Sequence, residues 1–128
     1  MPVKTYRGIR TDKGMLVTVE TGTTDYVLPL RLDLCNHSPT GFEIGYGGSG
    51  PAQLALAILA DALDAGRAHS QPSRRSWEDN ERDPRTIAVR WHQDFKRKFI
   101  ATLPRDSQWA ITQRDVLDFV ATKGANYD

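Results

Sequence analysis

The feature that most constrains the fold is an almost unbroken apolar stretch at residues 52–63, which follows a glycine-rich segment and Pro51. Proline suits the first position of a helix, because the backbone N–H that it lacks would have no partner there. At helical spacing the only polar stripe is narrow, and it consists of Gln53, Ala57, Ala60, Asp61 and Asp64. The helix is therefore expected to be buried around most of its circumference, with other elements on several sides.

The segment before this helix shows the period-two alternation of β-strands. In "YVLPLRLDL", one face carries Tyr26 and four leucines, while Arg31 and Asp33 point away. Pro29 cannot donate a ladder hydrogen bond, which places this strand at a sheet edge or at a bulge. About four strands are expected within residues 3–46, at 6–10, 15–20, 26–34 and 41–46. Their connections are too short for parallel crossovers, so the sheet should be antiparallel.

Three helices are predicted, at about residues 51–65, 84–103 and 112–123. Gly66 is expected to end the first of them. In the second, Ala88, Trp91 and Phe95 should be buried, with Arg90 and Arg97 exposed on the opposite side. Strands first and helices afterwards indicate a single α+β domain over residues 1–128, in which about three helices pack on the sheet.

The third helix has clear signals at both ends. Thr112 and Asp115 have the spacing of a capping box, and Ile111 can pack against Val116 as a hydrophobic staple. Gly124 is expected to terminate the helix. The polar segment at residues 66–83 has no apolar period, and we expect it to be a long mobile loop.

Composition limits the classes of function. The chain has 128 residues, with 17 basic and 16 acidic side chains, so its net charge of +1 does not call for a polyanionic partner. Cys35 is the single cysteine, which favours a reducing, cytoplasmic setting. The first ten residues have no apolar signal core, and no apolar run reaches the length of about 20 residues that spans a bilayer. Export and membrane insertion are therefore not expected.

The glycine-rich segment before the long helix matches the spacing GxGxxG, but the surrounding pattern does not fit a nucleotide site. A dinucleotide fold needs a second parallel strand after the helix, and a Walker loop needs Lys and Ser/Thr where this chain has Pro51 and Ala52. We interpret the segment as a structural turn made by Gly45, Gly47, Gly48, Gly50 and Pro51. At least one of these glycines should have a positive φ.

Three residues near this turn are candidate binding residues: His37, Glu43 and Tyr46. His37 and Glu43 flank the sequence "HSPTGFE", but closeness in sequence is not the geometry of a catalytic triad, and we assign no catalytic residue. The cysteine and the histidines form no paired motif of zinc spacing, so neither a metal site nor a cofactor is expected. The histidines are expected to be hydrogen-bonded residues at the surface or at its boundary with the core.

The polar segment 66–83 supplies the other candidate binding residues, Arg74, Arg75 and Trp77. Arginines beside an aromatic ring can grip phosphate and stack on a base, and the second helix adds further basic residues. The acids of the same segment would oppose a polyanion, whereas Trp and Arg are also typical anchors of protein interfaces. A protein partner is favoured, and nucleic acid is the alternative.

Three segments give the chain a family resemblance: "LDLCNHSPTGFEIGYGGSGPAQLALAILAD", "FKRKFIATLP" and "WAITQRDVLDFV". Over about residues 28–121 it resembles an uncharacterised family of small proteins encoded in bacterial chromosomes, phages and integrative elements. The resemblance implies a mobile-element, cytoplasmic setting, and it brings no catalytic residues. The segment 66–83 looks peculiar to this chain or its near relatives.

These observations lead to one functional hypothesis and two alternatives. We expect a non-enzymatic recognition protein of a mobile genetic element, which acts as a monomer or small homo-oligomer and binds a host or element protein. An inhibitor of a bacterial defence system is one version. A nucleic-acid-binding accessory protein is the first alternative, and a small nucleotide-binding or hydrolytic enzyme is the second.

Overall fold

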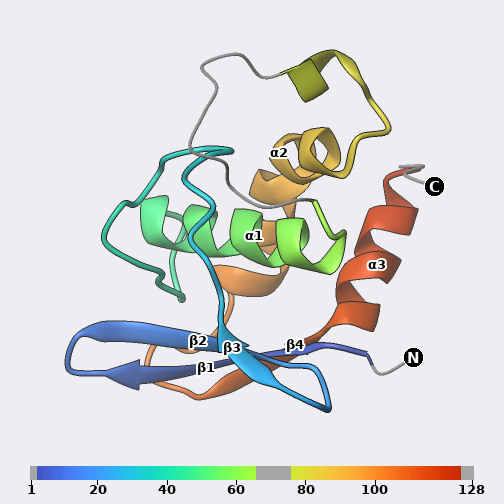
Figure 1. Cartoon of the computed structure of the whole chain (residues 1–128). Coiled ribbons are helices and arrows are strands. Elements are labelled where there is room, and N and C mark those ends of the chain that lie inside the picture. The colour runs from blue at the N-terminus through green and yellow to red at the C-terminus, as the bar shows by residue number, and fades with distance from the viewer. Residues whose placement is uncertain (1–2, 66–75, 125–128) are drawn as a thin grey trace.

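The computed structural model describes residues 3–65 and 76–124. Its sheet has four antiparallel strands in the order β3-β2-β1-β4 (Figure 1). The strands are β1 (Thr5–Thr11), β2 (Gly14–Glu20), β3 (Asp25–Val27) and β4 (Trp109–Thr112). Together with three α-helices this confirms the predicted α+β class.

The fourth strand differs from the prediction. It is β4, which pairs with β1 from the other end of the chain, whereas residues 41–46 make only a single bridge between Phe42 and Met15. Phe42 and Ile44 are nevertheless buried in the core. The chain leaves the ladder at Gly45, whose N–H donates instead to the carbonyl of Ile100.

The predicted strand at 26–34 is also much shorter. β3 ends at Val27, and one more backbone hydrogen bond joins Leu28 N–H to Val17 before Pro29, which has no N–H to donate. Arg31 then takes a left-handed conformation with φ of 59°, and the chain turns towards the helices. Leu28 and Leu34 are still buried, whereas Tyr26 and Leu32 of the same predicted face are exposed, so the alternation identified only part of the buried set.

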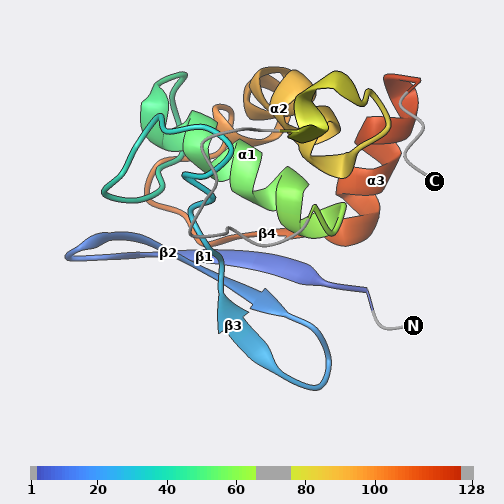
Figure 2. The ribbon, with the colours of Figure 1, turned by 45° about the horizontal axis from the view of Figure 1, so that its top comes forward.

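The three α-helices lie on one face of the sheet, as two views of the ribbon show (Figure 2). They are α1 (Ser49–Ala62), α2 (Pro84–Phe95) and α3 (Gln113–Thr122). The predicted second helix at 84–103 is in fact α2 followed by a π-helical turn, Lys96–Ile100. None of the described helices is both long and apolar enough to cross a bilayer.

α1 is the centre of the fold, and it is buried at nearly every position as its sequence requires. It begins at Ser49, so that Pro51 is its third residue rather than its first, still within the turn where a missing N–H costs nothing. It ends at Ala62, and Asp64 follows in the left-handed conformation with φ of 55°. Gly66, the predicted stop, lies outside the described residues.

The other two helices pack their aromatic side chains together. The ring of Phe95 stacks on Phe99 at 4.7 Å between centroids and meets Phe119 edge-on at 5.2 Å. Ala88 and Phe95 are buried and Arg90 and Arg97 exposed, as predicted, whereas Trp91 is only half-buried. The signals at the two ends of α3 also agree with the prediction. Thr112 and Asp115 make the capping box, and Gly124 has a φ of 69°.

Candidate binding cleft and histidine cluster

The glycine turn contains one strained position. Gly45 has a φ of 85°, which confirms the predicted positive φ. Gly47, Gly48 and Gly50 do not have a positive φ. The carbonyl of Gly47 accepts a hydrogen bond from Lys96 Nζ at 3.1 Å. A Cβ on Gly50 would lie 2.7 Å from Cβ of Glu43, so this glycine lets α1 approach the preceding segment closely.

The prediction that Trp77 lies in an exposed loop is wrong. It belongs to a 3-10 helix, Ser76–Asp79, and its half-buried ring packs against the core. The guanidinium of Arg85 lies 5.6 Å from the ring centroid, and Thr86 Oγ1 donates to the Trp77 carbonyl at 2.8 Å. Residues 76–83 are thus joined to α2. Arg74 and Arg75, with the rest of the predicted mobile segment up to residue 75, lie outside the described residues.

Glu43 and Tyr46 lie at a surface with Arg10 and Arg105. Glu43 accepts two hydrogen bonds from the Arg10 guanidinium, at 2.8 and 3.0 Å, and these bonds hold the pKa of the carboxyl below its ordinary value. The ring of Tyr46 is 43% exposed, with the Arg105 guanidinium 5.8 Å from its centroid. Glu43 is therefore a paired carboxylate, a state that disfavours its use as a proton acceptor.

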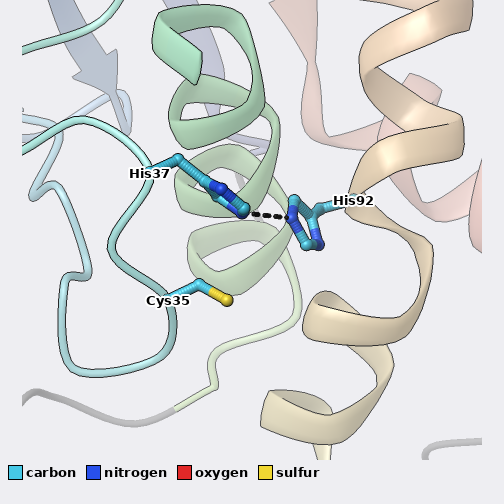
Figure 3. A group of neighbouring side chains, drawn as sticks. All are labelled: Cys35, His37 and His92. Atoms are coloured by element: carbon cyan, nitrogen blue, oxygen red, sulfur yellow. Dashed lines mark hydrogen bonds between the residues drawn. The ribbon is translucent and has the colours of Figure 1, made fainter. Parts of the chain in front are cut away.

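His37 and His92 form a cluster with Cys35, although 55 residues separate the two histidines (Figure 3). Cys35 and His37 come from the segment between β3 and α1, and His92 comes from α2. The two Nε2 atoms are 2.9 Å apart, and one ring nitrogen from each histidine and Cys35 Sγ all lie within 4.8 Å of one another. Both histidines are hydrogen-bonded, as expected, but His92 is only 4% exposed and is thus buried rather than at the surface or its boundary.

The protonation of His92 follows from its surroundings. Burial is the largest cause and lowers the pKa of His92, although the hydrogen bond with Val89 offsets part of this, and the net lowering favours the neutral imidazole. Nδ1 lies 2.6 Å from the carbonyl oxygen of Val89, an acceptor only, so the ring proton sits on Nδ1 and donates to that oxygen. The Nε2 lone pair of His92 therefore faces His37.

Gln53 holds the segment that carries this cluster. Its side-chain amide is fully buried in α1 and makes all four hydrogen bonds available to it. Oε1 accepts from the backbone N–H groups of His37 and Ser38, and Nε2 donates to the carbonyls of Leu30 and Cys35. A buried amide with its full set of partners fixes the backbone on both sides of the cysteine.

A cleft of about 800 Å³ lies between α1 and the residues that follow β3. We call it the α1 cleft, and it is lined by Lys4, Tyr26, Pro29, Leu30, Arg31, Leu32, Asp33, Ala57, Ala60, Asp61, Asp64 and Ala65. The polar stripe of α1 supplies four of these residues. Tyr26 and Leu32 are exposed apolar side chains among the lining residues.

Most charges of the α1 cleft are paired within it. Asp61 accepts hydrogen bonds from Tyr6 at 2.7 Å, Tyr26 at 2.6 Å and Lys4 at 3.1 Å. Burial and the Asp61 carboxylate together raise the pKa of Tyr6. Arg31 Nε lies 2.9 Å from Asp33 Oδ1. Asp64 is exposed and makes no ion pair with any residue that the structure describes.

Two strained backbone positions flank this cleft. Arg31 and Asp64 are the only non-glycine residues with positive φ in the described part of the chain, and both line the cleft. Such conformations cost free energy and concentrate at functional sites. From the sequence we noted the stripe of α1 but not this site, because the cleft exists only where the chain after Pro29 crosses the helix.

The chain belongs to a family of unknown function, DUF6166, whose model matches residues 6–78, more than half of the chain. The matched part includes most of the α1 cleft together with Cys35 and His37, whereas His92 lies beyond it. Comparisons with curated proteins and with solved structures give no match.

Proposed function

We propose that this member of the DUF6166 family is a non-enzymatic recognition protein, which binds a protein partner through the α1 cleft. The setting that we propose is a mobile genetic element, where the partner is a host or element protein, and inhibition of a bacterial defence system is one version of this role. The observation that carries the proposal is a preformed cleft with an apolar wall and a carboxylate, Asp64, that makes no ion pair within residues 3–65 and 76–124.

The chemistry of the cleft suits a basic side chain from the partner. The stem of a Lys or Arg would contact Leu32 and the ring of Tyr26, and its charge would meet Asp64. Asp61 already accepts three hydrogen bonds, so it holds the wall of the cleft rather than offering a free charge. Docking a long basic side chain in this way desolvates its apolar stem and leaves its charge paired.

The nucleic-acid alternative has less support among the described residues. The arginines of α2 and the turn after it pair with nearby acids: Arg85 with Asp83, Arg90 with Glu81, and Arg97 with Asp94. Each pair would have to be broken or shared before a phosphate bound. The two alternatives also differ in salt dependence, since only phosphate contacts release many counterions.

The test uses Asp64, because its substitutions separate binding from folding. Asp64→Asn removes the charge with little change of shape, and Asp64→Gly places glycine at a left-handed position that it adopts without steric cost. We expect both variants to melt no lower than wild type and to bind about tenfold more weakly or worse. The partner would be captured from the native host, and binding isotherms measured with the purified partner.

Asp12→Asn is the matched control, since Asp12 is an exposed acid in the β1–β2 turn, and its binding should equal that of wild type. Full binding by both Asp64 variants would overturn the proposed site. A captured nucleic acid, with affinity that falls steeply as salt rises, would replace the protein partner by the alternative.

A further inference from the structure

We propose that Cys35, His37 and His92 form a binding site for a Zn²⁺ ion, which would join the segment between β3 and α1 to α2. A thiolate and two imidazoles are a ligand set that zinc prefers, whereas Mg²⁺ and Ca²⁺ require oxygen ligands. The site is independent of the α1 cleft and does not depend on the proposed partner. The spacing of residues along the chain does not indicate this site, because His92 is on a different element from Cys35 and His37.

The distances between the ligand atoms are close to those of a zinc site. Tetrahedral bonds of about 2.0–2.1 Å to nitrogen place two Nε2 atoms about 3.3 Å apart, and a Zn–S bond of about 2.3 Å places sulfur about 3.6 Å from each nitrogen. The two Nε2 atoms here are 2.9 Å apart, and the largest separation in the set is at most 4.8 Å. Zinc binding would therefore lengthen the Nε2–Nε2 separation by about 0.4 Å and bring Cys35 Sγ to about 3.6 Å from each nitrogen.

The groups around the cluster resemble the outer shell of a metal site. His92 Nδ1 donates to the Val89 carbonyl, and this is the arrangement by which metal-binding histidines are oriented. Gln53 fixes the backbone at Cys35 and His37 through its four hydrogen bonds. The backbone of Cys35 and His37 and the ring of His92 are therefore positioned without the ion. In the ion-free protein the lone pair of His92 accepts the Nε2 proton of His37, and the ion would take the place of that proton.

The local charge is also acceptable for a dication. The Cys35 thiolate would neutralise one charge of the ion. Lys96 lies near His92, but its ammonium group is directed to the carbonyl of Gly47. Three protein ligands leave a fourth position for water or another donor, as in zinc sites that exchange a ligand.

The test uses Co²⁺ as a spectroscopic probe for Zn²⁺ in the full-length protein after treatment with a chelator. Wild type should bind one Co²⁺ with a thiolate-to-metal charge-transfer band and the visible bands of a tetrahedral ion, and Zn²⁺ should displace it. Cys35→Ser should lose the charge-transfer band, and His37→Gln should bind about tenfold more weakly or worse. Cys35 and His37 are only half-buried, so these variants are expected to fold, which circular dichroism would check.

Asp94→Asn is the matched control, because Asp94 is a carboxylate on α2 outside the cluster, and its Co²⁺ spectrum and affinity should be those of wild type. Zn²⁺ should also slow alkylation of Cys35, which mass spectrometry reports without ambiguity in a chain with one cysteine. A wild-type protein with no charge-transfer band would overturn the proposal. So would a His37→Gln variant that binds as tightly as wild type.

Discussion

Gly45 combines two features that exclude a larger residue. Its φ of 85° is rarely adopted by a residue with a Cβ, and a Cβ there would lie 2.9 Å from Cγ of Arg105 and 3.1 Å from the Leu103 carbonyl oxygen. We expect Gly45→Val to lower the free energy of unfolding by about 1–3 kcal/mol, measured by urea denaturation. The substitution should act through stability and not by removing a ligand site.

Gly47 offers the matched control, because its φ is not positive and an added Cβ would meet nothing within 4 Å. Gly47→Ala should therefore unfold within about 0.5 kcal/mol of wild type. If Gly45→Val unfolded at the wild-type urea concentration but lost affinity for a phosphate ligand, the structural interpretation of the turn would be wrong.

At the scale of elements, Phe95 joins α2 to α3. Its ring is fully buried and contacts both Phe99 and Phe119. Phe95→Ala would leave a cavity beside the rings of Phe99 and Phe119. Large-to-small changes of this kind cost about 3–5 kcal/mol. We expect a corresponding loss in the free energy of unfolding, measured by chemical denaturation.

Arg97→Ala serves as the control for this helix, since Arg97 is exposed and pairs with Asp94 at the surface. An isolated surface ion pair contributes about 0–1 kcal/mol, so this variant should be close to wild type. A loss for Phe95→Ala no larger than that for Arg97→Ala would contradict the packing described above.

Sequence patterns predicted the burial of side chains better than the pairing of strands. Leu28, Leu34, Phe42 and Ile44 are buried as their alternation indicates, yet none of them lies in a named strand. The alternation is wrong for Tyr26, Leu32 and Tyr46, which belong to the same predicted faces but are exposed. Alternation reports which side chains face the core, whereas a ladder also needs a free strand edge. β4 was missed because its four residues lead directly into the capping box of α3.

In the whole molecule, one segment connects the two candidate sites. Residues 28–48 leave the sheet, cross α1 and form the α1 cleft on one side of Gln53 and the histidine cluster on the other. The stripe of α1 and the candidate His37 could be predicted from the sequence. The meeting of His37 with His92 could not, because it depends on how α2 packs against α1. Trp77 was misjudged for the same reason, since its ring is covered by contacts with α2.

The acid sensitivity of the whole fold should depend on Glu43 and Asp83. Hydrogen bonds from Arg10 and Arg85, respectively, lower the pKa of each carboxyl, and the Arg10 guanidinium also donates to the Arg105 carbonyl before β4. Because the folded pKa lies below the unfolded one, the unfolded chain binds more protons as the solution is acidified. The stabilisation is therefore present above the ordinary values of 4.5 and 3.8 and is lost as the pH falls through the folded values.

We expect the free energy of unfolding, measured by urea denaturation at a series of pH values, to fall between about pH 5 and about pH 2. In Glu43→Gln/Asp83→Asn the neutral amides cannot titrate, and Asn keeps the side-chain oxygen that caps α2. The double variant should be less stable than wild type at neutral pH, and its stability should fall less over the acid range. Parallel pH profiles for the two proteins would contradict this prediction. They would mean that Glu43 and Asp83 contribute nothing to the difference in proton uptake between the folded and the unfolded chain.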